Sequence, residues 1–114
     1  MALENKTDFD NLELGLQFVT DLSSVTYKWE SEDCLDVGFK VDEVQALEVS
    51  AGYDIIFKNN ILTTPSEDGS KVTIDYIKFV PVLVNAIQEL SAKNEDLLTR
   101  IETLELLKQE QENG

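Results

Sequence analysis

A chain of 114 residues has room for one domain of ordinary size. Nine Lys and Arg against 23 Asp and Glu give a formal net charge of −14, which disfavours nucleic acid and anionic membranes as partners, because both attract basic proteins. The one cysteine, Cys34, excludes an internal disulfide. Because the chain has no histidine, the commonest zinc ligand and general base are missing, and we expect neither a metal site nor a cofactor.

The longest apolar run, residues 79–84, is far shorter than the roughly 20 residues that cross a bilayer as a helix. The sequence also opens without a charged and then apolar leader. We therefore expect a soluble chain without a membrane partner and without a secretion signal of its own.

The first predicted element is a helix over residues 10–22. Apolar residues recur there every four positions, at Leu14, Phe18 and Leu22, and this spacing gathers them on one helical face. We expect that face to pack into the core of the domain.

A β-hairpin is predicted next. Val25, Tyr27 and Trp29 alternate with polar residues, which is the two-residue period of a half-buried strand. A polar turn at residues 30–33 leads to a second strand at residues 34–39. Tyr27 and Trp29 are expected to pack in the core, and contact with a client protein is the alternative.

The stretch VGFKVDEV, residues 37–44, is interpreted as a structural corner. Gly38 would permit close approach of the backbone, while Phe39 and Val44 would enter the core. The apolar spacing of three that follows predicts a short helix, whose acidic residues, Glu48 among them, point to solvent. The alternative is that polar residues of this corner touch a neighbouring subunit or the client.

Shorter elements complete the first part of the chain. A strand is predicted at residues 54–57 and a turn at residues 58–60. A second turn is predicted across TTPSEDGSK, residues 63–71, because this stretch is rich in residues that tolerate turn geometry. A last strand is predicted at residues 71–75, so residues 1–78 form a small α+β body.

One long helix is predicted from Tyr76 nearly to the end of the chain. Residues 79–114 of this helix are expected to mediate oligomerisation, and they belong to the same single domain as the body. The only proline after Tyr76, Pro81, lies in the first turns of this helix, where a missing N–H costs least. Spacings of three and four then alternate over more than three heptads, as at the a and d positions of a coiled coil. The predicted seam comprises Val80, Leu83, Ile87, Leu90, Asn94, Leu97, Ile101 and Leu104.

Polar and apolar residues beside this seam bear on how the helices associate. Asn94 is expected to fix the register, because a buried amide at an a position is costly unless it meets its counterpart on a partner chain. Arg100 and Glu105 fall at g and e positions, whose contact across parallel helices is worth about 0.3 kcal/mol. Leu98 and Leu107 widen the apolar face, so the pattern predicts an oligomer without fixing its number.

The alternative is that this helix packs back on its own body. For residues 80–90 both arrangements are open. For residues 94–107 a partner chain is favoured, since a body of about 75 residues has little spare surface to cover so much helix.

Three segments, in this order and spacing, resemble the C-terminal intramolecular chaperone domains of bacteriophage tail spikes, tail fibres and neck appendages. They read LGLQFVTDLSSVTYKW, VGFKVDEVQ and VTIDYIKFVPVLVNAIQELSAK, and the resemblance covers residues 14–93. In that self-cleaving family, of endosialidase type, a strand like PVSYKW and a block like YGFIAQEV precede a helix like VDYSKLVPLLVEAIKEL, which leads into a coiled coil.

The resemblance assigns family positions to individual residues. The chain departs from the pattern at Lys40, Val41 and Asp42, where relatives carry Ile-Ala-Gln. The residues that match are Tyr27, Trp29, Gly38, Phe39, Glu43, Val44, Asp75, Tyr76, Leu83, Ala86, Ile87, Glu89 and Leu90.

The resemblance also implies an upstream cleavage segment like Ser-Asp-x-Arg-Leu-Lys, in which the lysine activates a serine nucleophile. No serine precedes Leu14 here. Ser23 and Lys28 have the matching spacing, but they lack the Asp and Arg and fall at a junction between helix and strand. We therefore expect no catalytic residue and no enzymatic activity in this polypeptide alone.

The function implied by the resemblance is that of a homotrimeric chaperone. Three copies would bring the upstream fibre or appendage chains into register in the host cytoplasm during phage assembly. Self-cleavage would then release the domain, which would be absent from the mature virion. The alternative is a permanent trimerisation module that stays on its fibre.

Overall fold

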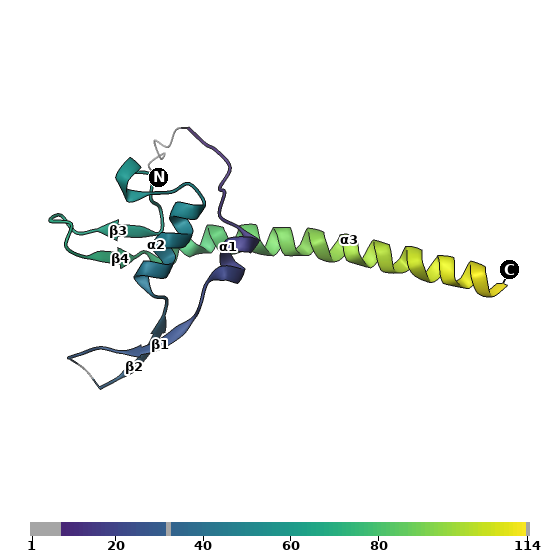
Figure 1. Cartoon of the computed structure of the whole chain (residues 1–114), viewed down its shortest axis with the longest axis horizontal. Helices are drawn as coiled ribbons and strands as arrows, with labels where there is room; N and C mark the ends of the chain where they lie inside the picture. Colours follow the sequence, from purple (N-terminus) through teal and green to yellow (C-terminus); the bar gives the residue numbers. More distant parts are fainter. Residues whose placement is uncertain (1–7, 32, 114) are drawn as a thin grey trace, which may run out of the picture.

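The computed structural model describes residues 8–31 and 33–113, apart from the side chain of residue 57. A small body of helices and two-stranded sheets is followed by one long helix that runs away from it (Figure 1). The radius of gyration is 21.0 Å, against about 13 Å for a compact chain of this length, because the long helix projects. The predicted mixture of helix and strand with a long C-terminal helix is confirmed.

The first helix, α1 (Leu16–Asp21), is shorter than predicted. Residues 8–14 have no helical structure. The side-chain amide of Asn85 instead donates hydrogen bonds to the backbone carbonyls of Leu12 and Leu14, both at 3.1 Å. Asn85, on the long C-terminal helix, therefore supplies the hydrogen bonds that the carbonyl groups of Leu12 and Leu14 would otherwise make within the predicted helix.

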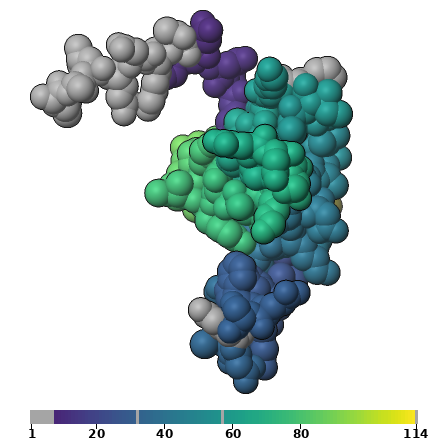
Figure 2. All heavy atoms as spheres, turned by 90° about the vertical axis from the view of Figure 1, so that its left-hand side faces the viewer, coloured from purple at the N-terminus to yellow at the C-terminus, as the bar shows by residue number. Residues whose placement is uncertain are grey.

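The predicted hairpin is confirmed: strand β1 (Val25–Lys28) pairs antiparallel with strand β2 (Leu35–Gly38). The register places Tyr27 opposite Asp36. Figure 2 shows this hairpin standing out from the rest of the body. Trp29, just beyond β1, is 54% exposed, so the prediction that it packs in the core is wrong.

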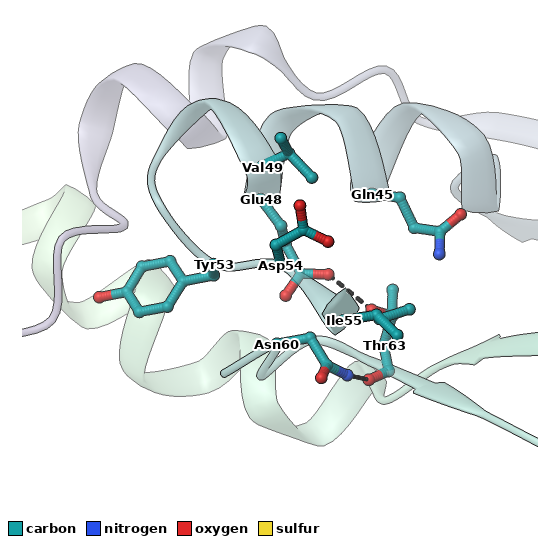
Figure 3. A pocket seen from close by; sticks show the side chains of 8 residues that line it. All are labelled: Gln45, Glu48, Val49, Tyr53, Asp54, Ile55, Asn60 and Thr63. Carbon is teal, nitrogen blue, oxygen red and sulfur yellow. Dashed lines mark hydrogen bonds between the residues drawn. The ribbon is translucent and has the colours of Figure 1, made fainter. Parts of the chain in front are cut away.

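The short helix α2 (Val41–Ser50) forms as predicted, but Glu48 does not point to solvent. Its side chain is 1% exposed, and its carboxylate accepts hydrogen bonds from the backbone N–H groups of Ile61 and Leu62, each at 3.0 Å. The hydroxyl of Thr63 donates a third bond at 2.7 Å (Figure 3). Three donors offset the desolvation of this carboxylate and join α2 to the following segment.

Residues 54–57, predicted as a strand, instead contain a turn of 3₁₀-helix, η1 (Ile55–Phe57). The carboxylate of Asp54 accepts a hydrogen bond from the N–H of Ile56 at 3.0 Å, and the N–H of Asp54 donates to the side-chain oxygen of Asn59 at 2.8 Å. Such local bonds between side chain and backbone compete with strand pairing, and the prediction is wrong here.

A second hairpin follows, in which β3 (Thr63–Pro65) pairs antiparallel with β4 (Val72–Ile74). The prediction of the second strand is confirmed. The first strand lies in the stretch predicted as a turn, which in the structure is confined to residues 66–71. Pro65 cannot donate to a ladder, and it is tolerated because each strand of a two-stranded sheet is an edge strand.

A 3₁₀ turn, η2 (Tyr76–Lys78), leads directly into α3 (Phe79–Asn113), which has 35 residues and is therefore about 52 Å long. The first turns of α3 pack on α1 and on the core. The buried core cluster consists of Leu14, Phe18, Val44, Leu62, Phe79 and Val82.

Candidate assembly surface

The base of α3 presents one apolar face to the body and another to solvent. Phe79, Val82 and Ala86 face the core and are 4%, 1% and 5% exposed. Val80 and Ile87, each one residue further along, are 56% and 66% exposed, since one residue turns the helix by about 100°. The body therefore covers a different face of α3 from the one that carries the predicted seam.

Beyond Ala86, every described residue of α3 is exposed. Asn94 lies on this free part, and Arg100 pairs with Asp96 of the same helix at 3.1 Å. A row of large apolar side chains without a covering surface marks an interaction site. Its members are Ile87, Leu90, Leu97, Leu98, Ile101, Leu104 and Leu107.

A groove of about 680 Å³ lies between strand β1, the segment that leads from β2 into α2, and strand β4, and reaches the residue that begins η2. It brings together four residues of the family pattern, with Gly38 packed against two of them. We call it the aromatic groove. Its principal lining residues are Tyr27, Trp29, Phe39, Val41, Ile74 and Tyr76.

Tyr76 connects this groove to the core. Its hydroxyl oxygen accepts a hydrogen bond from the backbone N–H of Phe39 at 3.0 Å. Its ring stacks on Phe39 with centroids 5.8 Å apart and on Phe79 at 6.0 Å. The floor of the groove is therefore anchored to the first residue of α3.

A carboxylate that the prediction missed, Asp36, organises the outer wall of the groove. It accepts hydrogen bonds from the indole N–H of Trp29 at 3.1 Å and from the hydroxyl of Tyr27 at 3.4 Å. The backbone N–H of Val37 holds the pKa of Asp36 below its ordinary value, with help from Trp29 and Tyr27. Loss of solvation, together with the negative charge of Asp36, raises the pKa of Tyr27. The hairpin register could have revealed Asp36, since it lies opposite Tyr27.

The remaining family-pattern residues lie apart from the groove. Val44 is in the core, and Glu43 is half-buried on α2. Asp75 forms an ion pair with Lys78 at 3.7 Å. Glu89 accepts a long hydrogen bond of 3.4 Å from the backbone N–H at the start of α1, which gives it a structural role.

Within residues 8–31 and 33–113, no group of three His, Cys, Asp or Glu side chains is placed to hold a metal ion. None of the helices in the described part of the chain combines the length and hydropathy needed to cross a membrane. The cavity beside Glu48 (Figure 3) measures about 50 Å³, room for a few water molecules.

Comparison with models of known protein families found no match, and comparisons with curated proteins and with solved structures found none either. The function is therefore inferred from the residues and surfaces of the chain itself.

Proposed function

We propose that this chain is a trimerising intramolecular chaperone, of the kind found at the C-terminal ends of bacteriophage tail spike, tail fibre and neck appendage proteins. Three copies associate along the seam of α3 and hold the chains that precede them in register. After folding, cleavage upstream releases the domain from its client. The observation that carries this proposal is the free apolar face of α3 from Ile87 to Leu104.

The physical advantage of such a domain lies in the folding of intertwined β-structure. Strand pairing between separate chains is slow, because the entropy of bringing distant segments together is lost before any contact compensates for it. Three ends joined by a coiled coil meet at a high effective concentration instead of by diffusion. A stable trimer at one end therefore accelerates registration at the other.

The separation of the two faces of α3 supports this role. Phe79, Val82 and Ala86 pack into the core of the body. The next residue after each of them, Val80, Leu83 and Ile87, belongs to the seam and has a large apolar side chain that the body leaves exposed. An amide at Asn94, in the middle of that seam, suits a parallel assembly in which identical residues meet. The chaperone function itself is proposed because three segments of the chain resemble the phage chaperone family in the same order and spacing.

The acidic surface opposes assembly and assists release. Three chains together carry a charge of −42, three times −14, so like charges repel within the trimer. Salt screens this repulsion. Raising the ionic strength is therefore expected to strengthen trimerisation.

The test is the mass of the chain in solution, measured by light scattering over a range of concentrations. The expected mass is about three times 12.8 kDa. The variant Ile101→Glu places a charge in the seam and is expected to be monomeric. Thr99→Glu places the same charge two residues earlier, at an outer f position, and is the matched control. A monomeric wild-type chain at every concentration and salt would refute the proposal.

The chaperone activity itself requires a client. A trimeric β-structured segment of a phage fibre, joined to the N-terminus of the chain, is expected to fold in higher yield with the wild type than with Ile101→Glu. Equal yields would refute chaperoning. A trimer that assists folding but is never released when the parent protein is expressed whole would indicate a permanent module.

A further inference from the structure

The β1–β2 hairpin carries apolar side chains on both faces. Cross-strand pairs alternate between faces, so Tyr27 shares one face with Asp36, and Leu35 and Val37 share the other. Leu35 and Val37 are 69% and 65% exposed. A two-stranded hairpin is marginally stable in water unless another surface packs on it, so both faces favour a partner. We call the face with Leu35 and Val37 the outer face.

The aromatic groove is continuous with the seam of α3. Tyr76 lines the groove and is 46% exposed. Val80, the first seam residue, lies four residues later and is 56% exposed. Ile77, between these two residues, is 82% exposed, so exposed apolar side chains follow the chain from the groove to the seam. A copy seated on the seam would therefore also border the groove.

Building on the trimer of the proposed function, we propose that the aromatic groove of each copy receives the outer face of the next copy's hairpin. A cyclic trimer needs two different, complementary patches on each subunit. The two faces of one hairpin supply both, so that three hairpins form a closed ring around the base of the coiled coil. The occupant of the groove is a second copy of this chain, held there by Leu35 and Val37.

Trp29 reports on this contact directly, because it is the only tryptophan of the chain and lines the groove. Its emission and its quenching by acrylamide are measured in the same samples as the light scattering. Assembly is expected to shift the emission to shorter wavelength and to protect the indole. Ile101→Glu supplies the monomer reference. A trimer whose Trp29 is as accessible as in that reference overturns the ring but leaves the proposed function intact. A monomer at every concentration overturns both.

Substitutions on the outer face separate the ring from the coiled coil. Val37→Glu is expected to keep the fold, since the side chain is 65% exposed, and to raise the concentration for half-assembly about tenfold. Trp29 should then remain accessible in the trimer that α3 still forms. Ile56→Glu, at a position 80% exposed on η1, is the control and should change neither quantity. Unchanged assembly and unchanged protection of Trp29 in Val37→Glu would overturn the inference.

Discussion

The hydroxyl oxygen of Tyr76 occupies the space that a side chain at Gly38 would fill. A Cβ atom added at Gly38 would overlap that oxygen and press on the ring of Tyr27. The same hydroxyl accepts the hydrogen bond from the N–H of Phe39. The end of β2 and the start of η2, far apart in sequence, therefore meet through one glycine and one tyrosine.

Replacing Gly38 by alanine is expected to lower the free energy of unfolding by about 1–3 kcal/mol, because overpacking forces neighbouring atoms apart. The measurement is urea unfolding followed by circular dichroism. Tyr76→Phe removes the clashing oxygen, so the second substitution should cost less in the Gly38→Ala background than in the wild type. Strictly additive effects would contradict the contact.

Glu48→Gln is expected to lower the free energy of unfolding by about 1–3 kcal/mol. The carboxylate accepts from three donors, whereas an amide has one accepting oxygen and turns its NH₂ group toward a donor. Glu67→Gln, at an exposed position in the turn between β3 and β4, makes the same chemical change and should have little effect. Equal stabilities of the two variants in urea would refute a structural role for Glu48.

Asn94→Ile is expected to raise the thermal stability of the assembled chain and to broaden its stoichiometry. An apolar residue at this seam position removes the cost of burying an amide and also the polar pairing that fixes register. Melting curves and sedimentation velocity measure the two effects together. A lower melting temperature with an unchanged single species would place Asn94 outside the seam.

The turn between β3 and β4 is expected to weaken in acid. The hydroxyl of Ser66, and the N–H and hydroxyl of Ser70, lower the pKa of Asp68 from 3.8 to about 2. A lowered folded-state pKa means that the unfolded chain binds the proton more readily, so this stabilisation is complete above about pH 4 and is lost as the pH falls toward 2.

Asp68→Asn removes that titration and should make the urea midpoint less dependent on pH between 4 and 2. The difference between the two proteins is the relevant quantity, because other carboxyl groups titrate in the same range. A direct NMR titration of the Asp68 side chain should give a pKa near 2. A titration at its ordinary value would refute these bonds.

The parts of the fold predicted from sequence are those governed by local periodicity. Val25 and Tyr27 revealed a strand by alternation, and the long run without glycine after Tyr76 revealed α3. Residues 54–57 were predicted as a strand, but Asp54 and Asn59 form local hydrogen bonds that stabilise a turn. The pattern of apolar residues contains no information about such bonds.

Of the two parts of the candidate surface, the sequence predicted the seam but not the aromatic groove. The seam on α3 could be listed residue by residue, because helical spacing alone defines it. The groove could not, since it joins β1, the start of α2, β4 and η2, which are distant in sequence. Asp36 could have been found only from its position opposite Tyr27 in the hairpin.

The sequence by itself determined the first hairpin, helix α2, strand β4 and the long helix α3, and which face of α3 carries large apolar residues every three or four positions, because these properties depend on neighbours within a few residues. Only the tertiary structure decided that Glu48 is buried, that Trp29 is exposed, and that the core covers the face of α3 beside the seam. Burial depends on which distant segments come to lie against a residue. A carboxylate such as that of Glu48 can be buried only where three donors from another element reach it.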